Sequence, residues 1–249
     1  MKIVELEQVQ HEIKIGQECP TIIPNIKEDC IFMEKGVAVG FFLNKMPEKA
    51  AKLAELADFE LRGKNVPKSS MKRSSGVEQF SCIIGSIPPK PHMRRPYPAI
   101  SSVHGHKSAK TFIKAMIMLG KESEQIIKDI LPAQYEEQMQ IFSEMDDKWK
   151  LGNMFTSSIS NYNISAPFHR DTGNIKNTVN VIITKRKNST GGNLHIPDYN
   201  ATIDQCDGSM LVYPAWRNVH GVTPIHSTQK GGYRNSLVFY PLKAFAGIK

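Results

Sequence analysis

His169 and Asp171 lie two positions apart in the segment "NISAPFHRDTGN", which covers residues 163–174. Side chains two apart in an extended strand point to the same face, so this imidazole and this carboxylate can bind one metal ion. A hydrogen-bonded surface pair explains the same triplet, and a third ligand is needed to separate the two interpretations. His220 is the best candidate, because it follows the strand-like run "SMLVYPA" and the turn "WRN".

Two histidines and one carboxylate form the facial triad of non-haem Fe(II) oxygenases, which leaves coordination positions open for a cosubstrate and dioxygen. A closed tetrahedral set would instead indicate structural zinc. The cysteines form no CxxC pair, so we predict reduced, buried thiols and neither a zinc site nor a disulfide framework. They are Cys19, Cys30, Cys82 and Cys206.

Arg234, in "GGYRNSLVFYP", follows His220 by the length of a strand and a turn. In a strand it shares a face with Ser236, so a guanidinium and a hydroxyl can converge on a carboxylate. This suits 2-oxoglutarate, whose oxo-acid end would chelate the metal while its distal carboxylate pairs with Arg234. Taken alone, Arg234 is better explained as a solvated surface charge, and it is its position after His169, Asp171 and His220 that favours the anchor.

The first half of the chain predicts a β-hairpin and three helices. The runs "CIFME" and "VAVGFFL" are separated by "KG", which is typical of a hairpin. Strong helix formers and helical spacing of apolar residues predict helices over 46–61, 108–131 and 133–145, with Pro132 separating the last two. The apolar stripe of the second helix, from Phe112 to Ile130, is expected to face the core.

From residue 153 onward the pattern changes to short runs rich in β-branched and aromatic residues, punctuated by glycine pairs. Six or more such runs indicate a double-stranded β-helix, the jelly-roll architecture that includes the cupins. The predicted fold class is therefore α+β, with a jelly-roll core, flanking N-terminal helices and a small N-terminal β region.

Composition indicates a globular chain of 249 residues without a long apolar run or a signal peptide, so we expect a cytosolic protein and no membrane partner. The net charge of +8 suits a polyanionic partner, although it serves solubility equally well. Cations concentrate in "RGKNVPKSSMKR" at 62–73 and "PKPHMRRPYP" at 89–98, which the proline, serine and glycine content predicts to be loops.

The strings "HRD", "GGNLHIPDY", "DGSMLVYPAWRNVHGVTP" and "YRNSLVFY" resemble the catalytic core of the TET/JBP group of Fe(II)/2-oxoglutarate dioxygenases. The upstream strings "MRRPYPAISS" and "LPAQYEEQM" are similar to segments of compact phage and microbial members, and the resemblance covers roughly residues 80–245. It implies Fe(II), 2-oxoglutarate and O2 as cofactor and cosubstrates. It also implies oxidation of the 5-methyl group of a pyrimidine, 5-methylcytosine or thymine, in nucleic acid, with release of succinate and CO2.

The resemblance implies that His169, Asp171 and His220 hold the iron. Arg234 would anchor 2-oxoglutarate, with Ser236 beside it. Asn174 falls where some members place a polar residue against the target base, and a turn-stabilising asparagine is the alternative.

Mammalian TET enzymes carry a cysteine-rich zinc region, and the scattered cysteines exclude an equivalent here. Engagement of nucleic acid, with DNA as the expected partner, would then fall to the basic loops. A target base within a duplex would have to be flipped out to reach the iron. Phosphate contact or base stacking is predicted for Arg94, Arg95 and Tyr97, and backbone tracking for Lys68, Lys72 and Arg73. Ordinary solvated charge is the alternative for each.

The predicted organisation is an N-terminal hairpin and helix region over 1–80 packed on a dioxygenase domain over 81–249. In that domain, 81–150 would give helical support and 151–249 the double-stranded β-helix. The location would be the host cytoplasm for a phage protein and the nucleus for a eukaryotic one. Hydroxylation of a protein side chain or a small molecule would use the same four residues, and a jelly-roll binding protein without activity is a third interpretation.

Overall fold

The computed structural model describes residues 1–63, 65–70, 78–90 and 95–247. Within this part of the chain the α-helices are α1 (Glu48–Arg62), α2 (Lys110–Ile130) and α3 (Pro132–Ser143). Short 3-10 turns cover Ser102–Gly105, Lys107–Ala109, Asp147–Trp149, Pro197–Tyr199 and Lys243–Phe245. The three helices predicted from the sequence are confirmed, with ends that differ by a few residues.

The strands of the N-terminal half are β1 (Lys2–Glu5), β2 (Cys30–Glu34), β3 (Val37–Leu43), β4 (Ser69–Ser70), β5 (Phe80–Ile87) and β6 (Ala99–Ile100). Those of the C-terminal half are β7 (Ser157–Tyr162), β8 (Ala166–His169), β9 (Asn180–Lys187), β10 (Ser189–Gly191), β11 (Leu194–Ile196), β12 (Ala201–Ile203), β13 (Met210–Tyr213), β14 (His220–Val222), β15 (Ile225–Ser227) and β16 (Tyr233–Tyr240).

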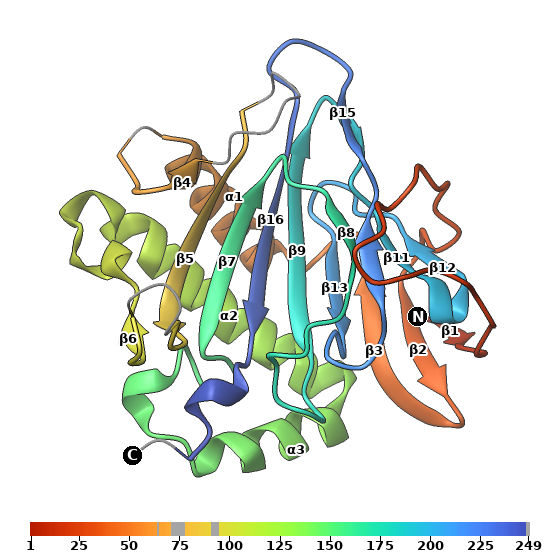
Figure 1. Cartoon of the computed structure of the whole chain (residues 1–249), viewed down its shortest axis with the longest axis horizontal. Helices are drawn as coiled ribbons and strands as arrows, with labels where there is room; N and C mark the ends of the chain where they lie inside the picture. The colour runs from red at the N-terminus through yellow and green to blue at the C-terminus, as the bar shows by residue number, and fades with distance from the viewer. Residues whose placement is uncertain (64, 71–77, 91–94, 248–249) are drawn as a thin grey trace.

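These strands form two main sheets (Figure 1). The large sheet runs in the order β1-β2-β3-β13-β9-β16-β7-β5-β4, with β6 on β5, and the small sheet in the order β12-β11-β14-β8. Strands β10 and β15 form a separate two-stranded antiparallel sheet. A cavity lies between the sheets, because it is lined by β7, β9 and β16 on one side and by β8, β11 and β14 on the other. The predicted double-stranded β-helix and α+β class are confirmed.

The N-terminal hairpin of β2 and β3 is also confirmed, and it extends the large sheet. Lys35 and Gly36 form its two-residue turn with positive φ angles of 51° and 78°, which suits the tight turns that match strand twist. Strand β3 then pairs with β13, so a strand from the first fifty residues lies beside the C-terminal core. The division of the chain at residue 80 stays a prediction.

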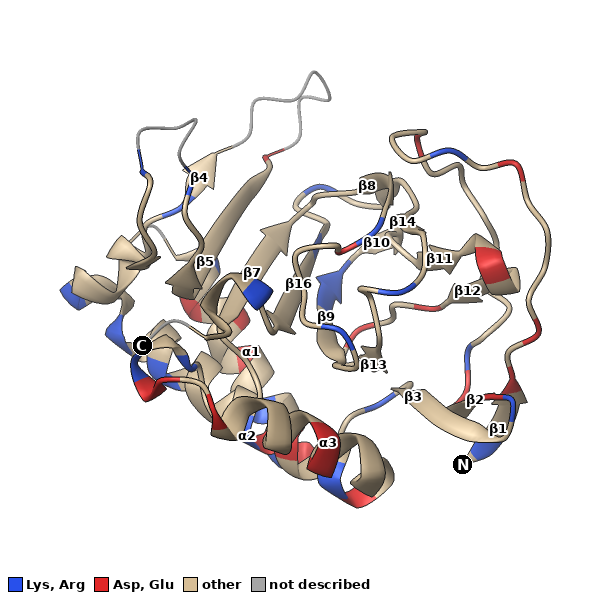
Figure 2. Cartoon of the chain, turned by 60° about the horizontal axis from the view of Figure 1, so that its bottom comes forward, with Lys and Arg blue, Asp and Glu red and all other residues tan. Residues whose placement is uncertain are grey.

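The helices cover one face of the large sheet (Figure 1). Helix α1 buries alanines at positions 50, 54 and 57, whose small side chains allow close packing, and α2 buries the predicted stripe, of which only Ile130 stays partly exposed. Helix α2 carries both acidic and basic residues, whereas the charged residues of α3 are all acidic (Figure 2). Within the described residues, no helix is long and apolar enough to cross a membrane.

Strand β16 places its residues alternately on the two faces of the large sheet, as the period of two requires. Leu237 and Phe239 belong to the core cluster under the helices. Arg234, Ser236 and Tyr240 line the cavity on the opposite face. The helical layer therefore fixes the strand whose other face forms the site.

Candidate metal centre and cosubstrate site

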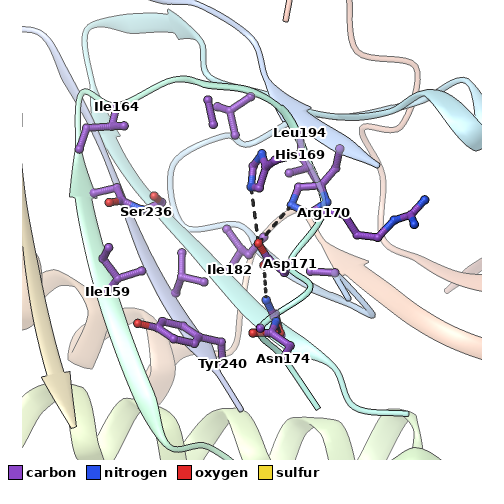
Figure 3. Close-up of a pocket in the computed structure, with 18 of the residues that line it drawn as sticks. Ile159, Ile164, His169, Arg170, Asp171, Asn174, Ile182, Leu194, Ser236 and Tyr240 are labelled. Carbon is purple, nitrogen blue, oxygen red and sulfur yellow. Dashed lines mark hydrogen bonds and ion pairs between the residues drawn. The ribbon is translucent and has the colours of Figure 1, made fainter. Parts of the chain in front are cut away.

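The structure brings His169, Asp171 and His220 together, with one ligand atom from each lying within 4.8 Å of the others. Asp171 Oδ1 lies 3.5 Å from His169 Nε2 (Figure 3) and 4.0 Å from His220 Nε2. All three atoms lie close enough together to share one metal ion, and imidazole and carboxylate donors in this ratio suit Fe(II). The triad can therefore hold the metal that the sequence predicts.

The small sheet places the two histidines opposite each other. His169 ends β8 and His220 begins β14, and they are direct partners in the antiparallel register, with ring centroids 4.3 Å apart. The N-terminal segment braces β8 from outside, because Phe168 receives a backbone hydrogen bond from Gly16 and donates one to Gln17. Asp171 lies just past the end of β8, where its backbone N–H donates to Ala215 O at 3.2 Å.

The outer nitrogens of both histidines have hydrogen-bond partners that leave Nε2 free for a metal. His169 Nδ1 lies 2.8 Å from Pro167 O, and His220 Nδ1 lies 3.1 Å from both Asn218 O and the Tyr213 hydroxyl. A carbonyl accepts, so Nδ1 carries the proton and Nε2 keeps its lone pair. Burial lowers the pKa of His220, against the opposing effect of the Asp171 charge, which favours the neutral ligand form.

Asp171 has its own supporting amides, which sequence reasoning missed. Asn180 Nδ2 donates to Asp171 Oδ2 at 3.1 Å, and Asn174 Nδ2 donates to Asn180 Oδ1 at 2.9 Å. An ionised carboxylate only accepts hydrogen bonds, so Asn180 must donate to Asp171 through its NH2 group and accept from Asn174 through its carbonyl oxygen. Both asparagines are buried, and the carboxylate orientation is fixed from outside the triad.

Arg234 reaches the same cavity from the large sheet, with Ser236 beside it on the same face. Arg234 is 3% exposed, and its Nε has no hydrogen-bond partner in the described part of the chain. Burial, and to a lesser extent the charge of Arg186, lowers the pKa of Arg234 to about 9, so it is protonated at neutral pH. A buried, unpaired guanidinium fits an anionic ligand, as the distal carboxylate of 2-oxoglutarate would be.

Gly192 leaves space for the side chain of Arg234. Its φ of +68° lies in the left-handed region, and a Cβ built there would come within 2.5 Å of Arg234 Cδ. A side chain at this position would therefore displace the guanidinium. From the sequence alone, the pair Gly191 and Gly192 predicts only a turn.

The cavity has a volume of about 450 Å³ and contains the triad, Arg234, Ser236 and Asn174 in its lining. Ile159 and Tyr240 lie across the cavity from Asp171 (Figure 3). Burial raises the pKa of Tyr240, and the Asp171 charge adds to this, so the phenol stays neutral. An apolar wall with a few convergent polar groups is typical of a small-molecule site.

Of the residues predicted to contact phosphates or stack on bases, the three that the structure describes, Lys68, Arg95 and Tyr97, do not line this cavity. Lys68 packs its ammonium 4.5 Å above the Phe80 ring and donates to Gly63 O at 2.6 Å. Arg95 donates to Pro88 O, while Tyr97 is 60% exposed. Lys72, Arg73 and Arg94 lie outside the described residues. Phosphate or base contacts by this group stay predictions.

The burial predicted for the cysteines holds for three of the four. All four are free thiols, with Cys19, Cys30 and Cys82 buried and Cys206 partly buried. Burial raises the pKa of Cys82 to about 12 and that of Cys30 to about 11, so both stay protonated and unreactive.

Comparison with known proteins identifies the family of the chain. Residues 91–243 match the family model Tet_JBP, the oxygenase domain of the 2OGFeDO superfamily, over more than half of the sequence. A sequence search of curated proteins found no match. Among solved structures, NgTET1 in complex with 5mC DNA is similar, with a TM-score of 0.63 and 15% identity over 94% of this chain and 84% of that one.

A 2OG-Fe(II) oxygenase family protein from Burkholderia pseudomallei has a TM-score of 0.49 and 14% identity, over 80% of this chain and 83% of the other. A full-length Neurospora crassa protein in complex with alpha-KG has a TM-score of 0.41 and 13% identity, over 81% and 75%. Because both TM-scores are below 0.5, these two structures do not strengthen the evidence for the fold. The family match shows that the chain belongs to the Tet_JBP oxygenases, dioxygenases that use Fe(II), 2-oxoglutarate and O2.

Proposed function

We propose that the chain oxidises the 5-methyl group of a pyrimidine, 5-methylcytosine or thymine, in nucleic acid. The observation that carries this proposal is that the metal-binding triad, Arg234 and Asn174 line one cavity of about 450 Å³. Iron held by His169, Asp171 and His220 would supply the oxidative chemistry, with 2-oxoglutarate consumed to succinate and CO2. Membership of the Tet_JBP family and the fold likeness to NgTET1, solved with 5mC DNA, support the substrate class.

Asn174 is the polar group best placed to read a base. One N–H of its Nδ2 donates to Asn180, and its side-chain carbonyl oxygen accepts no hydrogen bond from the described residues, so this oxygen can accept from a ligand. An acceptor at this point can take a hydrogen bond from the amino group of cytosine or from N3–H of thymine. The turn-stabilising alternative is weaker, because the Asn174 side chain bonds to Asn180 and not to its own turn.

Tyr240, on the wall facing Asp171, offers a neutral aromatic ring (Figure 3). Aromatic side chains stack on bases, and Ile159 continues the same wall. The base would enter flipped out of a duplex or from a single strand, because a paired base cannot reach a triad inside a cavity. The net charge of +8 supports a polyanionic partner.

The experiment is incubation with Fe(II), 2-oxoglutarate and defined substrates, followed by mass spectrometry of the released nucleosides. Duplex and single-stranded DNA, with and without 5-methylcytosine, and RNA are compared. The expected product is a hydroxymethylated pyrimidine in at least one nucleic acid, absent when 2-oxoglutarate is omitted. If succinate forms with no modified nucleoside in any of them, the substrate is instead a protein side chain or a small molecule.

A further inference from the structure

Among the described residues, three buried nitrogen donors without an acceptor belong to neighbouring residues at the arginine end of the cavity. They are Arg234 Nε, Arg186 Nη2 and Gln205 Nε2. Arg234 and Arg186 are direct cross-strand partners on β16 and β9, and Arg186 Nη1 donates to Gln205 O at 3.0 Å. Two cations placed opposite each other repel, and a buried donor without an acceptor destabilises the fold. The arrangement therefore suits an anion with several acceptor oxygens.

Gln205 is held rigidly at this point. It is fully buried and lines the same cavity as Arg234. Its Oε1 accepts from the Thr184 hydroxyl at 2.7 Å, and its backbone N–H donates to Asn193 Oδ1 at 3.1 Å. With one end of the amide engaged, Nε2 is the end that remains to bind a ligand.

We propose that Gln205 binds the distal carboxylate of 2-oxoglutarate together with Arg234 and so selects a dicarboxylic cosubstrate. A carboxylate has about four acceptor positions on two oxygens, so it can accept from the guanidinium and from the amide at once. Its negative charge also offsets the repulsion between Arg234 and Arg186, which a water molecule cannot do. This inference rests on the use of 2-oxoglutarate and is independent of the nucleic-acid substrate.

A neutral amide suits this position better than a third cation. The two arginines already provide the positive charge, and burial lowers the pKa of both. A donor without charge adds a directional contact and no further repulsion. Gln205 would therefore distinguish 2-oxoglutarate from 2-oxo acids that end in a methyl group.

The test measures two dissociation constants by calorimetry, on Fe(II)-loaded protein without oxygen and without nucleic acid. One ligand is 2-oxoglutarate, and the other is 2-oxopentanoate, which has a methyl group in place of the distal carboxylate. In Gln205→Met the constant for 2-oxoglutarate should rise about tenfold or more, the size expected for a hydrogen bond to a charged group. The constant for 2-oxopentanoate should stay within about twofold of wild type, because that ligand has nothing for Nε2 to contact.

Gln205→Glu keeps the shape and replaces the donor by a carboxylate, so it should weaken 2-oxoglutarate further than Gln205→Met does. Gln138 is the matched control, a fully buried glutamine whose amide is satisfied by Met154 O at 2.7 Å and by Val179 N–H at 2.9 Å. Gln138→Met should lower stability and leave both dissociation constants unchanged. Equal weakening of both ligands by Gln205→Met would show a structural role, and no weakening would show that the amide binds only water; either result overturns the proposal. Neither result depends on which substrate is oxidised.

Discussion

Asn180 Nδ2 donates a hydrogen bond of 3.1 Å to Asp171 Oδ2, while Oδ1 of the same carboxylate faces the two histidines. The amide therefore holds the carboxylate in the orientation that the metal requires. Groups that orient a ligand from behind commonly contribute about ten- to a hundredfold to metal affinity.

Asn180→Ala should accordingly weaken Fe(II) binding by about tenfold or more, measured by anaerobic metal titration. Asn235 provides the control, because it is also buried and donates to an aspartate, Asp58, at 2.9 Å, but on the face of the sheet away from the cavity. Asn235→Ala should lower the unfolding midpoint and leave metal affinity intact. Equal metal affinity in wild type and Asn180→Ala would refute the supporting role.

Arg234→Ala separates the cosubstrate from the metal. All three metal ligands remain, but the carboxylate of 2-oxoglutarate loses its guanidinium, so the apparent Michaelis constant for 2-oxoglutarate should rise about a hundredfold. Iron affinity should not change. Arg62→Ala removes an arginine paired with Asp58 under the sheet and should leave the Michaelis constant as it is. An unchanged constant in Arg234→Ala, with loss of iron, would mean that Arg234 is misassigned.

The pH dependence of stability should report on His104. Its Nε2 accepts the Gly85 N–H at 2.8 Å, and burial lowers its pKa from the ordinary value of 6.5. Below that value the unfolded chain binds a proton that the folded protein does not, so the stability contribution present above pH 6.5 is lost as the pH falls.

Urea unfolding of the metal-free protein should therefore show a lower midpoint at about pH 5.5 than at about pH 7.5. In His104→Gln, whose amide oxygen can accept the same N–H, the difference should be smaller. It should not vanish, because burial also lowers the pKa of His195. An unchanged difference in the variant would exclude His104 as a source of the dependence.

The salt dependence of DNA binding tests whether the basic loops contact phosphates. Cations that neutralise phosphates release counterions, so log affinity for duplex DNA should fall with log salt by roughly 0.9 for each phosphate contact. Replacing Lys68, Lys72, Arg73, Arg94 and Arg95 by glutamine should weaken DNA binding and flatten this slope in a fluorescence titration. 2-Oxoglutarate affinity should be unaffected.

A control with the same change of charge is available around α2. It replaces Lys107, Lys110, Lys114, Lys121 and Lys128, all exposed, by glutamine. This variant should keep most of the affinity if the loops bind the DNA. A wild type that does not bind DNA even at low salt would favour the protein or small-molecule hydroxylase.

The sequence predicts the parts of this molecule that depend on local pattern. The hairpin before residue 44, the helices and the spacing of His169, Asp171, His220 and Arg234 all follow from periodicity and turn residues. The shared face of Arg234 and Ser236 follows from the period of two in a strand. These features need no knowledge of how distant strands pair.

What the sequence does not predict depends on how separate strands come together in space. Asn180 begins β9 of the large sheet, whereas Asp171 follows β8 of the small sheet, and no local pattern predicts that their side chains meet. Gln205 has no motif, and it becomes a candidate only because Thr184 and the cavity are seen together. The placement of β3 against β13 has the same character, since it joins segments more than 160 residues apart.

The central claim is that Asp171 is the carboxylate of an iron site that turns over 2-oxoglutarate, and the rate of succinate formation tests it most directly. Wild type and Asp171→Ala are compared with Fe(II), 2-oxoglutarate and O2, beside Asp146→Ala, which removes a carboxylate that caps a turn outside the cavity. Wild type and Asp146→Ala should form succinate at similar rates. Asp171→Ala should form none while remaining folded by circular dichroism. Succinate formation at the wild-type rate in Asp171→Ala would contradict the assignment.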